Sequence, residues 1–291
     1  MRIAHVILAH KNPAQVARLT AALAHPGVDC YVHVDAKTDI TPFLELERQP
    51  GVYLCRTRID VQWGSYSLVQ ASLESLREAI SRGEYDYVNH LSGQDFPLRP
   101  ASEFYDFLCA NQGQEFITCY TEASGVDWWK DADLHLWRHN FHNWRIPGKY
   151  RLERLANRFL PRRRFPIEGY TVAGWSQWFT ITGRATRYML DFLDNHPEVV
   201  RFFKYVWGAD EFVASTVLYN SDYGAHVREN LLYLDWSEGK ANPKLLGIAD
   251  FEALVASEKW FARKFDAGVD ARILDRLEAH IAPRALQSPR L

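Results

Sequence analysis

The segment Trp207-Gly-Ala-Asp-Glu-Phe212 places two adjacent carboxylates, Asp210 and Glu211, where a helix is predicted to begin. Acidic side chains in a first turn cap free amides and complement the helix dipole, and this interpretation is favoured for Asp210. Glu211 has a second interpretation. If its side chain points into a cleft, partial burial raises its affinity for protons and prepares it to take one from a substrate hydroxyl group. Glu211 is therefore a candidate general base.

Basic residues interrupt apolar sequence at Asn242-Pro-Lys244 and at Phe261-Ala-Arg-Lys-Phe-Asp266. An ammonium group held against a diphosphate could neutralise it without a metal ion, although most lysines face water. The phosphate-binding loops Gly-x-Gly-x-x-Gly and Gly-x-x-x-x-Gly-Lys-Ser/Thr are absent from the sequence, so the main evidence for a Rossmann dehydrogenase or a P-loop enzyme is missing and another phosphate-binding group is needed. Lys244, Arg263 and Lys264 are the candidate phosphate-binding residues.

Polar residues also follow four predicted strands, in the segments 9–12, 33–37, 61–65 and 91–97. Ligands of an open parallel sheet bind beyond the carboxyl ends of its strands, so a site is expected where these segments meet. Asp35 could receive hydrogen bonds from the base or ribose of a nucleotide, or it could cap a turn. Ser92 to Asp95 could likewise belong to a ligand pocket or form only a tight turn held by the Asp95 side chain.

Asp131-Ala-Asp133 has the Asp-x-Asp spacing with which nucleotide-sugar enzymes hold a divalent cation. Its oxygen ligands would suit Mg²⁺ or Mn²⁺. The pair lies in an irregular segment and not at a strand end, which disfavours a metal site there.

The candidate residues must be positioned by strands and helices. Along the chain, runs of β-branched residues alternate with helical stretches, a pattern typical of parallel strands joined by crossover helices. Strands are predicted at 3–9, 29–34, 51–54, 87–92, 115–120, 177–182 and 231–236, and helices at 13–24, 67–80, 184–195, 197–206, 211–219 and 270–280. The prediction is an α/β fold with a mostly parallel sheet flanked by helices. It forms a single domain over residues 1–282, with an irregular insertion at 121–170 and a frayed tail at 283–291.

Composition narrows the classes of function. A formal net charge of −2 over 291 residues gives no general attraction to nucleic acid, so phosphate recognition must come from local cations. The four cysteines have no metal-ligand spacing and are predicted to be free thiols, as in a cytoplasmic protein. No run is long and apolar enough to span a bilayer, and the N-terminus lacks the features of a signal peptide. Peripheral association with the inner membrane is compatible with this pattern.

Seven motifs together resemble the core-2/I-branching β-1,6-N-acetylglucosaminyltransferases, the related peptide O-xylosyltransferases and their bacterial relatives. Nearly the whole chain is covered, and the order of the motifs is more specific than any one of them. They are Ile7-Leu-Ala-His-Lys11, Val32-His-Val-Asp35, Trp63-Gly64 with Ser67-Leu-Val69, Leu91-Ser-Gly-Gln-Asp-Phe-Pro-Leu98, Gly174-Trp-Ser-Gln-Trp178, Ala209-Asp-Glu211 and Phe261-Ala-Arg-Lys-Phe-Asp266.

The resemblance implies a GT-A-type fold and an inverting, metal-independent transfer from a UDP-sugar to a glycan or another hydroxyl acceptor. It implies that N-acetylglucosamine or xylose is transferred, with a β linkage, and that no cofactor is needed. Glu211 is then the catalytic base, and Lys264 and Lys244 replace the metal at the diphosphate. Lys244 departs from the Arg expected in the mammalian branching enzymes.

By the same resemblance, the donor is bound by His10, Asp35, Trp63, Ser92, Asp95 and the two lysines, and the acceptor by Trp175, Gln177 and Trp178. The insertion at 121–170 does not match the family and is expected to select the acceptor. The paired cysteines and membrane anchor of secretory-pathway members are missing, which favours a bacterial enzyme. Two alternatives stay open: an inactive carbohydrate-binding protein on the same fold, and a metal-dependent transferase that uses Asp131 and Asp133.

Overall fold

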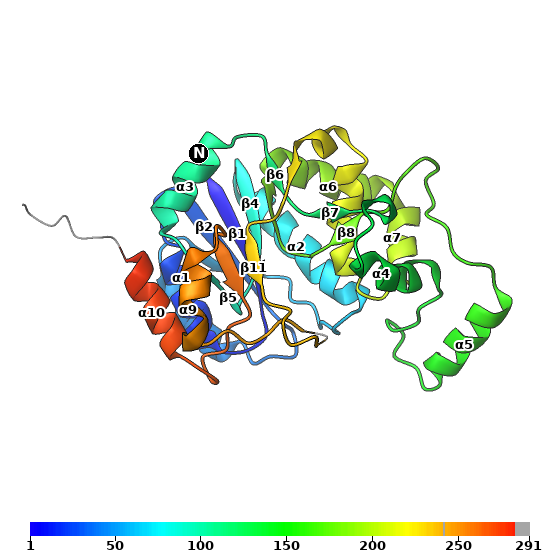
Figure 1. The fold of residues 1–291 in the computed structure, drawn as a ribbon, viewed down its shortest axis with the longest axis horizontal. Coiled ribbons are helices and arrows are strands. Elements are labelled where there is room, and N and C mark those ends of the chain that lie inside the picture. The colour runs from blue at the N-terminus through cyan, green and yellow to red at the C-terminus, as the bar shows by residue number, and fades with distance from the viewer. Residues whose placement is uncertain (241, 283–291) are drawn as a thin grey trace, which may run out of the picture.

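The computed structural model describes residues 1–240 and 242–282. Within them, a seven-stranded sheet has the order β10-β6-β9-β4-β1-β2-β3 and stands between two groups of helices (Figure 1). The strands are β1 (Ile3–Ala9), β2 (Val28–Val34), β3 (Val52–Leu54), β4 (Tyr87–Ser92), β6 (Glu115–Phe116), β9 (Phe179–Thr182) and β10 (Val227–Arg228). Only β9 runs against its neighbours among these strands. The mostly parallel sheet predicted from the sequence is confirmed.

The strands of this sheet contribute side chains to two apolar cores, one on each face of the sheet. Along β1, Ala4 and Val6 belong to one core, whereas Ile3 and Ile7 belong to the other, because successive side chains of a strand point to opposite faces. Both faces of β1 are buried, which explains why the strand reads as a continuous apolar run. Since one sheet serves both cores, the described residues form a single domain.

Helices cover both faces of the sheet, as Figure 1 shows. They are α1 (Pro13–Ala22), α2 (Tyr66–Arg82), α3 (Ala101–Ala110), α6 (Gly183–Asn195), α7 (Pro197–Phe203), α8 (Val213–Tyr219), α9 (Phe251–Ala256) and α10 (Arg272–Ile281). The side chains of Ser65 and Thr182 accept hydrogen bonds from amides in the first turns of α2 and α6, which sets where these helices begin. Helices α3 and α9 were not predicted. No helix in residues 1–240 and 242–282 is long and apolar enough to cross a membrane.

Two small sheets complete the fold. β11 (Leu232–Leu234), β12 (Phe261–Arg263) and β5 (Asp95–Pro97) form the first, and β7 (Cys119–Tyr120) and β8 (Gly174–Trp175) form the second. The strand predicted at 115–120 is thus divided between β6 and β7. β12 and β5 pair in antiparallel fashion with Arg263 opposite Asp95, and this register brings the C-terminal cations to the turn after β4.

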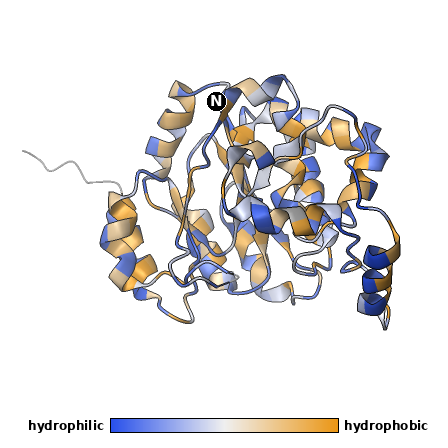
Figure 2. Ribbon diagram, turned by 45° about the vertical axis from the view of Figure 1, so that its right-hand side comes forward, coloured by the Kyte–Doolittle hydropathy of each residue, from blue (hydrophilic) through white to orange (hydrophobic). Residues whose placement is uncertain are grey.

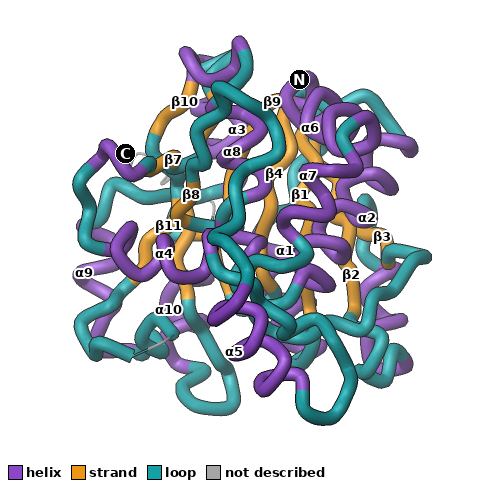
Figure 3. The backbone as a smooth tube through the Cα atoms, turned by 90° about the vertical axis from the view of Figure 1, so that its right-hand side faces the viewer, coloured by secondary structure: helices purple, strands orange, loops and turns teal. Residues whose placement is uncertain are grey.

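The insertion at 121–170 is not irregular throughout, so this prediction was wrong in part. It contains the helices α4 (Trp128–Trp137) and α5 (Lys149–Phe159). Helix α4 buries Trp129, Ala132 and Leu136, whose spacing is helical. Helix α5 projects from the body of the molecule, at the lower right in Figure 1 and toward the viewer in Figure 3. The tail predicted to be frayed, 283–291, lies outside the described residues.

Candidate functional site

A cavity of about 740 Å³ opens at the carboxyl ends of β1, β2 and β4, which is the edge of the sheet predicted to carry the site. Its volume suits a small-molecule ligand. Nine of the eleven site residues predicted from the sequence line it, namely His10, Asp35, Trp63, Ser92, Trp175, Gln177, Trp178, Glu211 and Lys264. Asp95 and Lys244 lie outside its lining.

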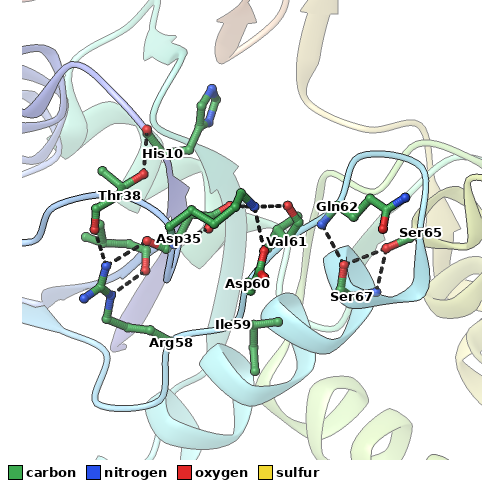
Figure 4. Close-up of polar contacts among 12 residues, drawn as sticks. His10, Asp35, Thr38, Arg58, Ile59, Asp60, Val61, Gln62, Ser65 and Ser67 are labelled. Carbon is green, nitrogen blue, oxygen red and sulfur yellow. Dashed lines mark hydrogen bonds and ion pairs between the residues drawn. The ribbon is translucent and has the colours of Figure 1, made fainter. Parts of the chain in front are cut away.

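Asp35 both caps a turn and lines the cavity. Its carboxylate accepts hydrogen bonds from the Lys37 amide at 2.9 Å and from the Lys37 ammonium group at 3.1 Å. Arg58 holds the same turn by donating to the carbonyl oxygens of Val34 and Asp35 (Figure 4). The two interpretations of Asp35 left open by the sequence are therefore compatible in one structure.

His10 lies at the end of β1 in a corner rich in cations. Thr38 Oγ1 donates to the His10 carbonyl oxygen at 2.9 Å, which ties the end of β1 to the turn after β2 (Figure 4). Burial, and then the ammonium groups of Lys11 and Lys264, lower the pKa of His10. An anionic ligand would therefore meet positive potential at this corner.

The turn after β4 is held tightly beneath the cavity. Asp95 Oδ2 accepts from the Ser92 amide at 2.8 Å, and the Gly93 amide donates to the Leu8 carbonyl oxygen at 2.8 Å. A Cβ at Gly93 would lie 2.9 Å from Val16 Cγ2, so a side chain at this position would displace Val16. Asp95 is fully buried, which raises the pKa of its carboxyl group to about 6. Its place below the lining indicates that it shapes the turn.

Glu211 ends a 3₁₀ turn, Ala209–Glu211, immediately before α8. The turn begins at Gly208, which has a φ of 67°, and it packs against β8 so closely that a Cβ at Gly174 would lie 2.8 Å from the Glu211 carbonyl oxygen. Burial, and then the neighbouring charge of Asp210, raise the pKa of Glu211 to about 8. A carboxylate with a raised pKa in a cavity is the property expected of a general base.

Arg263 is a cation with a side chain that is only 12% exposed, and the charges of two carboxylates act on it. Its guanidinium group lies 4.4 Å above the ring of Trp178, and Nη1 is 3.5 Å from Asp95 Oδ1. Asp210 is the second carboxylate whose charge acts on Arg263. Nε and Nη1 of Arg263, Oδ1 of Asp95 and Oδ1 of Asp210 are buried without hydrogen-bond partners among the described residues. The two Arg263 nitrogens are therefore donors left free for a ligand.

The two lysines predicted to bind a diphosphate have different environments. Lys264 lines the cavity, and burial, followed by the charges of Arg263 and Lys11, lowers its pKa. Lys244 does not line the cavity. Its ammonium group donates to Asp250 Oδ1 at 2.6 Å and is 3.7 Å from Asp235 Oδ2. The neighbouring residues Asn242 and Pro243 line the cavity instead.

Aromatic side chains form much of the remaining wall. The ring of Trp175 packs edge to face against Trp128 at 5.4 Å, and Trp128 stacks on Phe212, next to Glu211. Trp236 and Trp63 line the opening and are 46% and 57% exposed. Gln177 Nε2 is buried and has no partner in the described part of the chain. Flat apolar surfaces with a few free donors suit a carbohydrate.

Asp131 lies on α4 with an exposed side chain and does not line the cavity. Asp133 is on the same helix, but its side chain lies outside the described residues. Among the described side chains, no group of three or more His, Cys, Asp or Glu is arranged to hold a metal ion.

Two aromatic lining residues, Trp128 and Trp236, were not predicted as site residues. They reach the cavity only through tertiary packing, and no local pattern distinguishes them from the other tryptophans. Arg263 was one of three candidate phosphate-binding cations, but the family resemblance assigned the diphosphate to Lys264 and Lys244 alone. Arg263 interrupts an apolar run in the same way as Lys264, and this feature of the sequence could have marked it as a site residue.

Comparison with known proteins gives a consistent result. A family model described as "Core-2/I-Branching enzyme" matches residues 3–255. Xylosyltransferase oxt of Drosophila pseudoobscura pseudoobscura is 26% identical over 302 residues, covering 91% of this chain and 31% of the relative. Human xylosyltransferase 1 is 25% identical over 313 residues, covering 97% of this chain and 30% of the relative. The chain therefore spans about a third of the length of these curated relatives.

Proposed function

The chain belongs to the Core-2/I-branching enzyme family, and from this membership we propose that it is an inverting glycosyltransferase acting on a UDP-sugar and a hydroxyl acceptor. The observation that carries the proposal is that one cavity holds Glu211, with a pKa raised to about 8, together with the cations Arg263 and Lys264. A base for the acceptor and positive charge for a diphosphate leaving group are the two requirements of this reaction.

The proposed reaction is a single in-line displacement. Glu211 accepts the proton of the acceptor hydroxyl group while its oxygen forms a bond to the anomeric carbon. The bond from that carbon to the diphosphate oxygen breaks on the opposite face, and UDP leaves with the electron pair. Cations placed in advance stabilise the charge that develops on the diphosphate. An α-linked donor gives a β-linked product.

We propose that the reaction needs no divalent metal ion. Lys264 and Arg263 supply positive charge from the cavity wall. Lys244 is proposed as a further diphosphate ligand, and to act in this way its ammonium group must leave Asp250. The alternative of a metal held by Asp131 and Asp133 has less support, because Asp131 is exposed outside the cavity lining.

For the donor, we propose N-acetylglucosamine or xylose. The family description names branching enzymes, and the curated relatives are named xylosyltransferases. Uridine is proposed to bind near Asp35 and the donor sugar near Ser92. Trp175, Gln177 and Trp178 form the wall proposed for the acceptor.

A panel of UDP-sugars tests the proposal, with thermal stabilisation and donor hydrolysis as the two measurements, each in the presence and absence of excess chelator. Stabilisation by UDP-xylose or UDP-N-acetylglucosamine with turnover that survives chelation is expected. Turnover that chelator abolishes and Mn²⁺ restores would favour the metal-dependent alternative. Binding without turnover for every sugar, with and without an oligosaccharide acceptor, would favour the inactive carbohydrate-binding protein.

A further inference from the structure

Helix α5 leaves its apolar side chains in solvent. Leu152, Leu155 and Phe159 are 43%, 52% and 73% exposed, and their spacing of three and four residues aligns them in one stripe. No residue of α5 is buried. A helix of 11 residues obtains most of its stability by packing an apolar face. The exposed stripe therefore indicates a surface that binds a partner.

The other side of α5 is already fixed to the molecule. Glu153 Oε2 accepts from the Phe141 amide at 2.9 Å, while Asn157 bonds to the amide and the carbonyl group of His139, each at 2.8 Å. At about 100° per residue, Glu153 and Asn157 lie on the side of the helix opposite Leu155 and Phe159. These polar contacts hold the helix so that the apolar stripe faces outward, and Figure 2 shows hydrophobic and hydrophilic residues sharing this projecting helix at its right edge.

The segment around this helix is strongly basic. Residues 144–164, here called the α5 segment, contain eight Lys or Arg residues and one acidic residue, Glu153. Its net charge is +7, in a chain of net charge −2, so the rest of the chain carries −9. Arg151, Arg154 and Arg158 are exposed, and at about 100° per residue Arg151 and Arg158 lie beside the apolar stripe whereas Arg154 lies further round the helix. In the described part of the chain, none of these three forms an ion pair.

Further exposed apolar side chains flank the helix. Trp144, Ile146 and Tyr150 are 36%, 46% and 60% exposed, and Leu160, just past the end of α5, is 52% exposed. Tryptophan and tyrosine favour the boundary between lipid headgroups and acyl chains, and a basic amphipathic helix lies in the plane of that boundary.

We propose that the α5 segment docks on the surface of a lipid bilayer that contains anionic lipids. Leu152, Leu155 and Phe159 enter the boundary with the acyl chains, and the arginines beside them bind the phosphate groups of the lipids. The charge argues for this partner. A second copy that docked through the same segment would bring two segments of charge +7 together, and a nucleic acid would leave the apolar stripe exposed.

The docking surface is joined to the rim of the cavity. His142, in the loop that carries α5, contacts the Trp63 carbonyl oxygen through Nε2 at 2.8 Å, and Gln62 Nε2 donates to the His142 carbonyl oxygen at 3.1 Å. Asn143 Oδ1 accepts from the Tyr66 amide at 2.7 Å. A bilayer bound at α5 is thus coupled through one loop to the segment that lines the cavity.

Sedimentation with vesicles tests the proposal on the full chain. The protein should sediment with vesicles of phosphatidylcholine and phosphatidylglycerol, about tenfold or more tightly than with phosphatidylcholine alone, and binding should weaken as salt is raised. Free inorganic phosphate at the same phosphate concentration should not release it, because it cannot bury the apolar stripe. Absence of binding to the anionic vesicles at low salt would overturn the proposal.

Two double variants separate the apolar and the charged contributions. Leu155→Ser/Phe159→Ser, which changes no charge, and Arg151→Glu/Arg158→Glu, which keeps the apolar stripe, should each weaken vesicle binding about tenfold or more. Leu44→Ser, at an apolar residue that is 49% exposed outside the α5 segment, is the matched control and should bind normally. Unchanged melting temperatures show that the variants fold. Normal binding by the Leu155/Phe159 variant would overturn insertion of the stripe, and a dimer in sedimentation velocity that this variant dissociates would assign the surface to a second copy instead.

Discussion

The Gly208 amide donates to the Gly64 carbonyl oxygen at 3.0 Å, and this bond joins the loop that carries Trp63 to the turn that carries Glu211. Both glycines have a positive φ, 71° at Gly64 and 67° at Gly208. Gly64 also lies directly against a tryptophan, because a Cβ there would be 2.8 Å from Trp207 Nε1. The position of the proposed base therefore depends on a contact that strongly favours glycine.

Gly64→Ala should lower both stability and turnover. The left-handed backbone alone costs about 1–2 kcal/mol for a residue with a Cβ, and the contact with Trp207 adds to this. Gly113→Ala is the matched control, since Gly113 has a φ of 81° and open space around it. Urea unfolding and initial rates are the measurements. Equal losses in the two variants would show that the contact with Trp207 contributes nothing.

Glu211→Gln should reduce kcat by about 10²-fold or more and leave the affinity for UDP nearly unchanged. The amide keeps the shape of the side chain but cannot accept the proton of the acceptor hydroxyl group. Initial rates with the best donor of the panel and calorimetric titration with UDP separate the two effects. A Gln variant that transfers sugar at the normal rate would exclude Glu211 as the base.

The rate of the wild-type protein should rise with pH, be half-maximal near pH 8 and level off about one pH unit higher. The base must be deprotonated to act, and its pKa in the folded protein is raised to about 8 by burial and by Asp210. Measurement of kcat/KM from about pH 5 to about pH 10 gives the profile. A rate that is flat between roughly pH 6 and pH 9, the range over which such a group titrates, would contradict this assignment.

Lys264→Ala should weaken UDP binding about tenfold or more, whereas Lys244→Ala should have a smaller effect. Lys264 lines the cavity, but the ammonium group of Lys244 is held by Asp250 at 2.6 Å. Titration with UDP in excess chelator compares the two variants directly and keeps metal ions out of the result. A larger loss for Lys244→Ala would mean that this side chain leaves Asp250 when the nucleotide binds.

The parts of the fold and site that could be predicted are those with local signals. Strands such as Ile3–Ala9 and Tyr87–Ser92 are apolar runs bounded by polar turns, and the rule for strand ends located Asp35 and Ser92. The turn at Ser92 to Asp95 was predicted at the site, but the pairing of β12 with β5 is not local, so the sequence did not indicate that Asp95 lies opposite Arg263.

Other features were missed for the same physical reason. Helix α4 was not predicted because its buried residues Trp129 and Leu136 are surrounded in the sequence by other aromatic residues, so the helical spacing of the buried ones is not apparent. The engagement of Lys244 by Asp250 is a tertiary contact between side chains, and the type of residue at position 244 does not reveal it.

Arg263→Met should destabilise the protein by about 3–5 kcal/mol, because it removes the cation from two buried carboxylates, Asp95 and Asp210. The pKa of each carboxyl group is raised to about 6 by burial, so both are largely ionised at about pH 8 and protonated at about pH 4. The loss should therefore be larger at the higher pH, because protonated carboxyl groups need no counter-charge. Urea unfolding at both pH values is the measurement.

The double variant Arg263→Met/Asp95→Asn decides whether the loss comes from this charge pair. The substituted amide keeps an oxygen for the Ser92 amide, which donates to the Asp95 carboxylate at 2.8 Å in the native protein. Removing the charge of residue 95 should therefore recover part of the stability at the higher pH, because the second substitution removes the desolvated carboxylate that Arg263→Met leaves without its counter-charge. Strictly additive losses in the two single variants and the double variant would show that Arg263 and Asp95 do not interact, and would leave the charge of Asp210 and packing on Trp178 as the contributions of Arg263 to the fold.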